Sequence, residues 1–443
     1  MQEAYGQYLK GPLDGNLIRK IRAEFPRCES DANGRKRAFF DNGTGTLVVG
    51  RAVQAYAKTL TDCSATVGAS FDESHAAEAA FSEGRKAVAD LLNAPSPENI
   101  VAGESTGNLL FKLSYALGKQ FSGRENIVTT DYEHYANISP WIELEKRHAI
   151  RELRFARIDK DEWTLDMEHL KELIDDNTRV VTVTAASNLL GTKSPLQEIA
   201  KIAREVNAYF VVDGVHHVSH GPVDVQALDC DFYVFSGYKL FTTPEAFLYG
   251  REEHLKALQP YTTYGPFSSS VPPSKWEGRF DQGVFAAICG VADHLSWISD
   301  LVKEQYEEQF TGYSGRARSL KIAMSAIEKY SEEQSRAVLE GLDDAPGLLA
   351  MPHVKVYGLT DLDRLDERDP TFAFKVKNMP DEEVARLLWT KYGIALRASN
   401  FASRVLEVLD VSTMVRAALT HYNNLEEIYQ FLKALDDIGK TLK

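Results

Sequence analysis

Three stretches in the middle of the chain decide its fold class: RVVTVTAA (Arg179–Ala186), YFVVD (Tyr209–Asp213) and DFYVFS (Asp231–Ser236). Each is a near-continuous run of β-branched and aromatic residues, and an amphipathic stretch, Leu196–Asn207, separates the first two. Such runs, separated by helices, are typical of parallel strands that are buried on both faces of a sheet. The sequence therefore predicts an α/β domain of the doubly wound kind.

The alternation extends toward the N-terminus, and the pattern changes after Gly250. Further strands are predicted at Asn99–Gly103 and Asn126–Thr130, and further helices at Asn108–Gly118 and Ile138–His148. Long helices are predicted within Ala286–Tyr330. They are followed by an α+β region with strands at Val354–Leu359, Thr371–Lys377, Ile394–Ala398 and Met414–Leu419 and helices at Asp381–Tyr392 and Leu425–Thr441. We expect three parts: an N-terminal segment (1–35) near a small domain, a large α/β domain (36–290), and linking helices with the small α+β domain (291–443).

Composition and charge exclude several classes of protein. The chain has 443 residues, 44% of them hydrophobic, which is typical of a globular protein with a sizeable core. Its net charge is −14, so we expect no nucleic-acid partner, because neutralising phosphate requires basic residues. No apolar run approaches the roughly 20 residues of a membrane helix, and the first ten residues lack a signal core. We therefore expect a cytoplasmic protein without a membrane partner.

The four cysteines, Cys28, Cys63, Cys230 and Cys289, are scattered and form no C-x-x-C pair. They are interpreted as reduced, packed thiols rather than zinc ligands.

Asp213 ends one predicted strand, and Lys239 closely follows the end of the next, Asp231–Ser236. Open α/β sheets bind ligands at the carboxyl ends of their strands. A buried lysine has a lowered pKa and can form a Schiff base, and an adjacent aspartate can hold a pyridine nitrogen protonated. This is the pairing that pyridoxal 5′-phosphate (PLP) requires; a buried Asp–Lys salt bridge is the alternative from spacing alone.

Three motifs carry a resemblance over nearly the whole chain: FFDNGTGT (Phe39–Thr46), HGPVDVQALDCDFYVFSGYK (His220–Lys239) and VRAALTHYNNLEEI (Val415–Ile428). With them the chain resembles the aminotransferase class V group of fold-type I PLP enzymes, in its cysteine-desulfurase-like branch. The resemblance implies a large domain with a mostly parallel seven-stranded sheet between helices, a smaller α+β C-terminal domain, PLP as cofactor and a homodimer.

The resemblance also implies roles for single residues. Lys239 is expected to bind PLP as an aldimine, Asp213 to pair with the pyridinium, and His134 to stack on the ring and assist proton transfer. The further expected cofactor-binding residues are Ser105, Thr106, Asn188, His216, Ser236 and Tyr238. Arg416 is expected to hold the substrate α-carboxylate, with Arg397 and Asn400 as further substrate-binding candidates. Taken singly, each could instead be a cap, loop or surface residue.

Departures from the family pattern restrict the reaction. No cysteine lies between Ile394 and Asp410, where desulfurases carry their nucleophile. Tyr238 replaces a histidine that usually precedes the lysine, and Ala246 a common glycine. Phe280 replaces a phosphate-binding threonine expected from the partner subunit, and whether Arg279 replaces that contact stays open.

These observations favour a PLP-dependent lyase or transferase that acts on an amino acid at Cα or Cβ, by a C–S lyase, β-elimination or related reaction without a persulfide cysteine. An aminotransferase, an epimerase, a decarboxylating enzyme and a non-catalytic PLP-fold binding protein stay open, as do the substrate and the bond broken. His216, His217 and His220 suggest a metal site only if they lie on a helix. A loop is predicted there, so no metal is expected.

Overall fold

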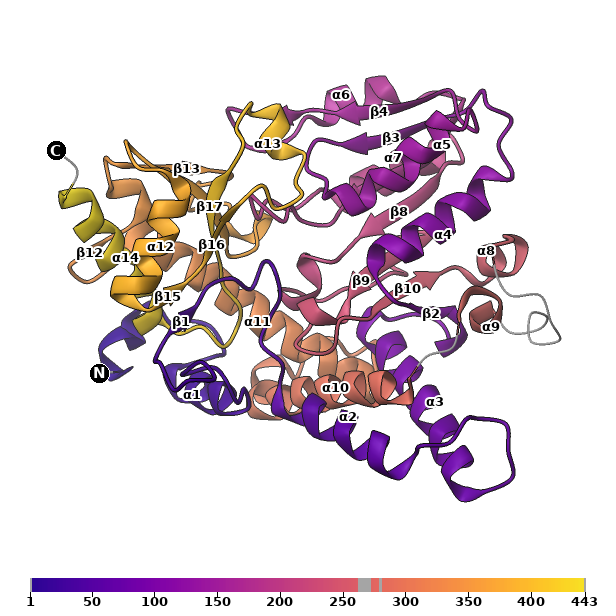
Figure 1. The fold of residues 1–443 in the computed structure, drawn as a ribbon, viewed down its shortest axis with the longest axis horizontal. Helices are drawn as coiled ribbons and strands as arrows, with labels where there is room; N and C mark the ends of the chain where they lie inside the picture. The colour runs from indigo at the N-terminus through magenta and orange to yellow at the C-terminus, as the bar shows by residue number, and fades with distance from the viewer. Residues whose placement is uncertain (1, 262–271, 279–280, 442–443) are drawn as a thin grey trace.

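A seven-stranded sheet forms the centre of the larger half of the molecule (Figure 1). The computed structural model describes residues 2–261, 272–278 and 281–441. The strand order is β2-β10-β9-β8-β7-β3-β4. β10 runs antiparallel to both neighbours, and the other pairs are parallel. The strands are β2 (Ile100–Gly103), β3 (Asn126–Thr130), β4 (Glu152–Ala156), β7 (Thr178–Thr184), β8 (Tyr209–Asp213), β9 (Phe232–Ser236) and β10 (Ala246–Gly250).

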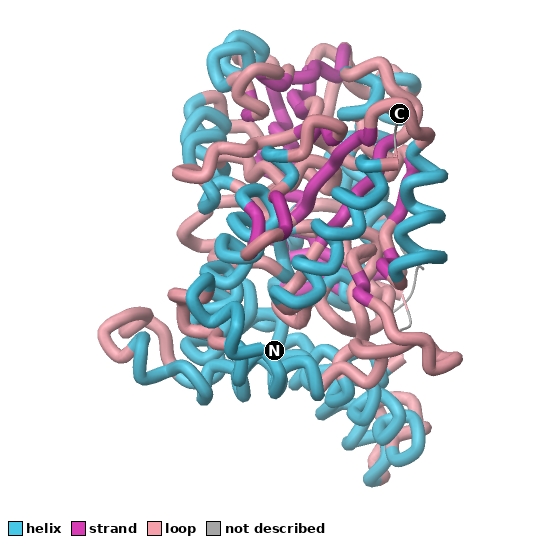
Figure 2. Tube along the Cα trace, turned by 90° about the vertical axis from the view of Figure 1, so that its left-hand side faces the viewer, coloured by secondary structure: helices cyan, strands magenta, loops and turns pink. Residues whose placement is uncertain are grey.

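Helices cover both faces of this sheet. The view turned by 90° shows the molecule from the side of the smaller half (Figure 2). Successive residues of a strand point to opposite faces. Phe210 and Val212 of β8 therefore join one core cluster, and Val211 joins the other. The helices on the first face include α2 (Gly50–Asp62), α3 (Asp72–Leu92), α7 (Leu196–Glu205), α10 (Gln282–Val302) and α11 (Gly315–Glu340). On the other face lie α4 (Thr106–Gly118), α5 (Ser139–Lys146), α8 (Glu252–Ala257) and α9 (Pro272–Trp276).

Helix α10 is the central helix of the first face. It packs against α2 and α3 through glycines: a Cβ at Gly290 would lie 2.6 Å from the Arg51 carbonyl oxygen, and one at Gly84 would lie 2.6 Å from that of Phe285. Within the described chain, the stretch Gln282–Tyr306 is long and apolar enough to span a membrane by length and composition alone. Because 61% of its 18-residue apolar window is buried, as in a core helix, this is weak evidence for a span.

A four-stranded sheet, in the order β13-β14-β17-β16, forms the smaller half. Both chain termini lie at this end (Figure 1). Helix α14 begins with a capping box in which Asn424 and Glu427 satisfy each other's backbone amides. The elements are β13 (Val354–Tyr357), β14 (Thr371–Val376), β16 (Arg397–Ser399), β17 (Met414–Ala418), α12 (Asp381–Tyr392), α13 (Val405–Val408) and α14 (Leu425–Lys440).

The remaining elements are short. They are α1 (Gly15–Ala23), α6 (Met167–Leu173), β1 (Ala38–Phe39), β5 (Ile158–Asp159), β6 (Thr164–Leu165), β11 (Gly341–Leu342), β12 (Ala345–Pro346) and β15 (Ile394–Ala395). In the N-terminal segment, the Tyr5 ring centroid lies 5.9 Å from that of Tyr429, and Arg22 pairs with Glu427 at 3.0 Å.

The expected fold class is confirmed, and one expected strand is corrected. Ile394–Ala398 is not continuous, because β15 pairs with β1 while β16 pairs with β17. The domain limits proposed from the sequence stay a prediction.

Candidate active site

A cavity of about 530 Å³ opens where the parallel strands end. Asp213 ends β8, Ser236 ends β9 and Thr184 ends β7, and because parallel strands share an edge, all three side chains line the cavity. Every site residue expected from the sequence lines it as well: Ser105, Thr106, His134, Asn188, Asp213, His216, Ser236, Tyr238, Lys239, Arg397, Asn400 and Arg416. Their individual roles stay predictions.

Lys239 and Asp213 are both buried in this cavity. Lys239 ends a 3₁₀ turn, η5 (Gly237–Lys239), and its Nζ donates to the Gly43 carbonyl. Burial and the neighbouring Arg416 lower the pKa of Lys239 to about 7, against the attraction of Asp213. Burial raises the pKa of Asp213 to about 6, although its Oδ1 accepts from the Val215 amide at 3.0 Å.

His134 and Asn188 approach the same space from two other loops. His134 caps a 3₁₀ turn, η3 (Tyr135–Asn137), where its Nδ1 accepts from the Ala136 amide at 3.0 Å. Burial and the charges of Lys239 and Arg416 lower its pKa to about 4, so the imidazole is neutral at pH 7. Asn188 Nδ2 donates to the Phe401 carbonyl at 3.0 Å, while its buried Oδ1 lacks a partner among the described residues.

An anion-binding corner lies at the N-terminus of α4. Ser105 caps the helix, since its Oγ accepts from the Asn108 amide at 3.2 Å. Thr106 Oγ1 and Ser236 Oγ lie 2.6 Å apart, which brings β9 to this helix end. Backbone amides and the helix dipole favour an anion at such a place. Arg279 and Phe280, raised above in connection with phosphate, lie outside the described residues.

Two arginines face the cavity from the smaller half. Arg416 and Arg397 are directly opposed in the β16–β17 register. Arg416 is 1% exposed; its Nη1 donates to the Asn188 carbonyl at 2.7 Å and its Nη2 to Thr44 Oγ1 at 2.8 Å. Burial lowers its pKa to about 10, and its Nε has no partner in the described chain. Arg397 binds Asp41 Oδ2 through Nε at 3.1 Å and Nη2 at 2.9 Å.

Comparison with known proteins supplies the family. A model of the aminotransferase class V family matches residues 38–431. This chain belongs to the aminotransferase class V family. It is 31% identical over 438 residues to a cysteine desulfurase of Klebsiella pneumoniae (strain 342), with 96% of this chain and 99% of that protein covered. An equal identity over 450 residues relates it to a cysteine desulfurase of Dickeya dadantii (strain 3937), covering 97% and 99% of the two chains.

A solved structure agrees with this membership. The apo structure of a cysteine desulfurase from Thermococcus onnurineus NA1 is similar with a TM-score of 0.80 and 26% identity, over 96% of this chain and 98% of that one. Members of the class V family use PLP, and the cysteine desulfurases among them are enzymes. The resemblance and the cofactor expected from the sequence are thereby confirmed at the level of the family.

The residues of the class V cavity fit PLP. Lys239 offers a buried amine for an aldehyde and Asp213 a buried carboxylate for a pyridine nitrogen. Asn188 Nδ2 has a second hydrogen for a ring oxygen besides the one it donates to the Phe401 carbonyl, and the hydroxyls at the start of α4 suit a phosphate. Each part of the cofactor therefore has a matching group in the cavity.

Sequence reasoning missed the part that residues 41–44 play in this class V site. Gly43 and Thr44 line the cavity, and a Cβ at Gly43 would lie 2.7 Å from Arg416 Cζ. Only glycine therefore lets the guanidinium approach so closely. The glycine-rich string FFDNGTGT (Phe39–Thr46) could have indicated this part of the site, but it served only to identify the resemblance. Phe401, which also lines the cavity, carried no comparable signal.

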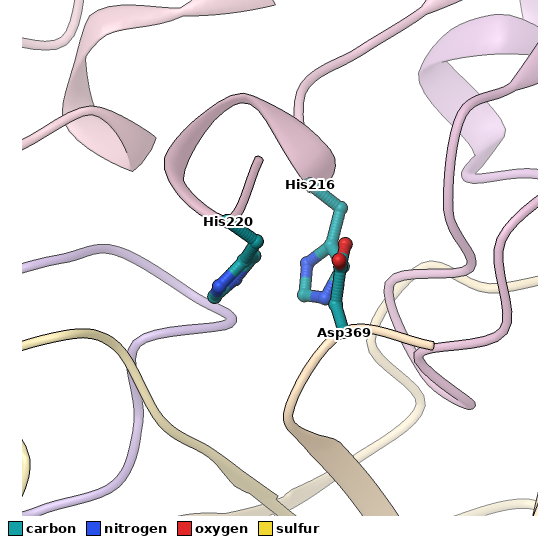
Figure 3. A group of neighbouring side chains, drawn as sticks. All are labelled: His216, His220 and Asp369. Carbon is teal, nitrogen blue, oxygen red and sulfur yellow. The ribbon is translucent and has the colours of Figure 1, made fainter. Parts of the chain in front are cut away.

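His216, which lines this class V cavity, forms a group with His220 and Asp369 (Figure 3). His216 and His220 flank a 3₁₀ turn, η4 (His217–Ser219), rather than the expected open loop, and Asp369 faces them from another segment. Candidate ligand atoms of the three residues lie within 4.8 Å of one another. His216 Nε2 lies 3.0 Å from Thr371 Oγ1, and His217 Nδ1 lies 3.1 Å from Asp369. These contacts describe a hydrogen-bonded network, and the absence of a metal stays a prediction.

Proposed function

We propose that this protein is a PLP-dependent enzyme that acts on an amino acid at Cα or Cβ, by a C–S lyase or β-elimination type of reaction without a persulfide cysteine. One observation carries the proposal. The cavity brings Lys239 and Asp213 together with His134 and Arg416, while no cysteine is found among the described residues that line it. The named relatives are cysteine desulfurases, which act on a sulfur-containing amino acid.

Different residues of the cavity would hold the cofactor and the substrate. Bound PLP would supply an aldehyde that condenses with amines and a ring that accepts electrons from Cα. Ser105, Thr106 and Ser236 would hold its phosphate, Asp213 its ring nitrogen, and Asn188 its ring oxygen. Arg416 would hold the substrate carboxylate with its remaining donor capacity, since a guanidinium matches a carboxylate in shape.

Two groups are placed to move protons. Lys239 Nζ, with its pKa near 7, can both accept and release a proton at neutral pH. The neutral His134 imidazole lies in the same cavity, and because its Nδ1 accepts from the Ala136 amide, its Nε2 carries the hydrogen and can donate to a leaving group. Lys239 is accordingly the proposed base at Cα, and His134 is the proposed assistant at the leaving group.

A visible absorption spectrum tests the proposal. The purified protein loaded with PLP should absorb as a Schiff base, and single amino acids added in turn should change that band when they are substrates. Lys239→Ala should abolish the Lys239 Schiff-base band and lower turnover by about 10³-fold or more. Lys146→Ala, at an exposed lysine, serves as the matched control.

Tight PLP binding with no response to any amino acid would instead favour a non-catalytic PLP-fold binding protein. Normal turnover by Lys239→Ala would refute the proposed role of the lysine.

We further propose a homodimer, as the resemblance implies. Four exposed apolar side chains on α2 and the segment after it support the proposal: Val53, Leu60, Val67 and Phe71. Large apolar side chains that gather on one stretch of the surface are often covered by a partner chain. Light scattering should give twice the chain mass, and an active monomer would contradict the proposal.

A cytoplasmic location is also proposed. The four cysteines are free, which fits a reducing compartment. Fractionation of cells that express the protein would test it, and recovery of oxidised protein from an exported fraction would refute it.

A further inference from the structure

One wall of the cavity comes from the smaller half of the molecule. This wall segment comprises residues 399–404, and its first four residues line the cavity: Ser399, Asn400, Phe401 and Ala402. Phe401 and Ala402 have φ values of 51° and 46°, which side chains other than glycine rarely adopt. Such a backbone persists only where neighbouring structure holds it.

The backbone of the wall segment is joined to the turn that carries His134. The Tyr135 amide donates to the Ala402 carbonyl at 2.8 Å, and the Arg404 amide donates to the Glu133 carbonyl at 3.0 Å. His134 and Ser403 form an antiparallel bridge between these two contacts. The wall and the His134 turn therefore move together or not at all.

The side chain of Arg404 connects the wall segment to the large sheet. Its Nε donates to Asp131 Oδ1 at 2.8 Å, directly after β3, and its guanidinium lies 3.8 Å from the Phe155 ring centroid of β4. The Asp131 side chain is only 9% exposed, so the ion pair is partly shielded from water. Figure 1 shows α13, which follows the wall segment, beside the ends of β3 and β4.

The wall in turn contacts Arg416, assigned to the substrate carboxylate, and Asn188, whose own carbonyl accepts from Arg416. The Phe401 ring lies 4.0 Å from Arg416 Cζ, and the Phe401 carbonyl accepts from Asn188 Nδ2. A shift of the wall would remove the ring from one face of the guanidinium and release the Asn188 amide. Both changes would alter how a carboxylate is held at Arg416.

We propose that Arg404 is a positioning residue, whose ion pair with Asp131 fixes the wall segment and, through Phe401, orients Arg416 for the substrate carboxylate. Arg404 itself does not line the cavity. The groups assigned to the cofactor's phosphate and ring nitrogen lie at the start of α4 and the ends of β8 and β9, so the loss of Arg404 should affect substrate affinity more than cofactor affinity. The kinetic consequence rests on the proposed function, whereas the fixing of the wall does not.

The test uses Arg404→Gln, Asp131→Asn and the double variant of the full-length protein loaded with PLP. Each single change should raise KM for the amino-acid substrate about tenfold, while kcat and the PLP dissociation constant change less than about threefold. The double variant should raise KM no more than about twofold beyond Arg404→Gln alone, because both changes remove the Arg404–Asp131 pair, while Arg404→Gln also removes the 3.4 Å pair with Glu407. Arg386→Gln, which breaks an exposed ion pair with Glu383, is the matched control.

Hydrogen exchange supplies a readout that needs no turnover. Amides of residues 399–404, and that of Tyr135, which donates to the wall, should exchange faster in both single variants, with the remainder of the protein unchanged. Wild-type KM or wild-type exchange in that segment would overturn the proposal. So would a parallel loss of PLP and thermal stability, because the pair would then support the whole fold. If the wild type responds to no amino acid, the proposed function fails, and exchange alone decides whether Arg404 fixes the wall.

Discussion

Single residues in the cavity have pKa values that their burial sets. The pKa of Lys239 is about 7, mainly because burial disfavours the ammonium form. The neutral amine that attacks an aldehyde should therefore predominate above pH 7, whereas an exposed lysine would need a pH near its ordinary pKa of about 10.4. We expect the rate at which PLP loads onto cofactor-free protein to rise between pH 6 and 8 and then level off.

Stopped-flow absorbance at a series of pH values measures that loading rate. A rate that keeps climbing to pH 10 would show that Lys239 titrates like an exposed lysine.

Glu133 is a second buried group with a shifted pKa. Burial raises the pKa of its carboxyl to about 8, although Thr130, Asn137 and the Thr184 amide donate to it. A pKa raised above its unfolded value means that the folded state binds the proton more tightly. This stabilising contribution is complete below about pH 4.5 and is lost as the pH rises through 8.

The thermal midpoint of cofactor-free wild type should therefore fall between pH 6 and 9. Glu133→Gln cannot titrate, so it should show a shallower fall, whatever its absolute stability. Equal slopes for the two proteins, measured by differential scanning calorimetry, would mean that Glu133 is ionised in the folded state.

Among the elements, α10 depends on glycine for its close approach to α2. An added methyl at Gly290 would meet the Arg51 carbonyl and the Ala52 backbone, neither of which can rotate away. Gly290→Ala should therefore force the helices apart and destabilise the protein by about 1–3 kcal/mol. At Gly312 a Cβ would meet nothing within 4 Å, so Gly312→Ala is the control. Urea unfolding should show a lower midpoint for the first variant only.

At the scale of the whole molecule, the thiols lie away from the cavity. Cys28 and Cys230 are buried, and burial raises the pKa of Cys28 to about 12 and of Cys289 to about 11. Thiols with such pKa values react slowly, because the thiolate is the nucleophile. Alkylation of the native protein with iodoacetamide should leave turnover within about twofold of the untreated enzyme. Inactivation in step with the labelling of one cysteine would indicate a thiol intermediate and contradict the proposed reaction.

Sequence patterns were sufficient for the buried strands and for the helices with clear ends. The expected strand limits at Asn126–Thr130 and Tyr209–Asp213 agree with β3 and β8, because fully buried strands are continuous apolar runs. β4 (Glu152–Ala156) was not foreseen, since this edge strand mixes Glu and Arg with its apolar residues. β10 was also not foreseen, because periodicity alone does not distinguish a five-residue apolar strand from a buried piece of helix.

Local sequence pattern and spacing therefore predicted the fold class and the chemistry proposed for Lys239 and Asp213. They could do so because buried strands and the ends of strands are recognisable from neighbouring residues in the sequence. Only the tertiary structure revealed that Thr44 binds Arg416 across 372 residues of sequence, and that Asp131 binds Arg404 across 273. Contacts of that kind depend on how the two halves of the molecule meet. No local periodicity encodes that geometry, since it arises where segments far apart in the sequence pack against each other.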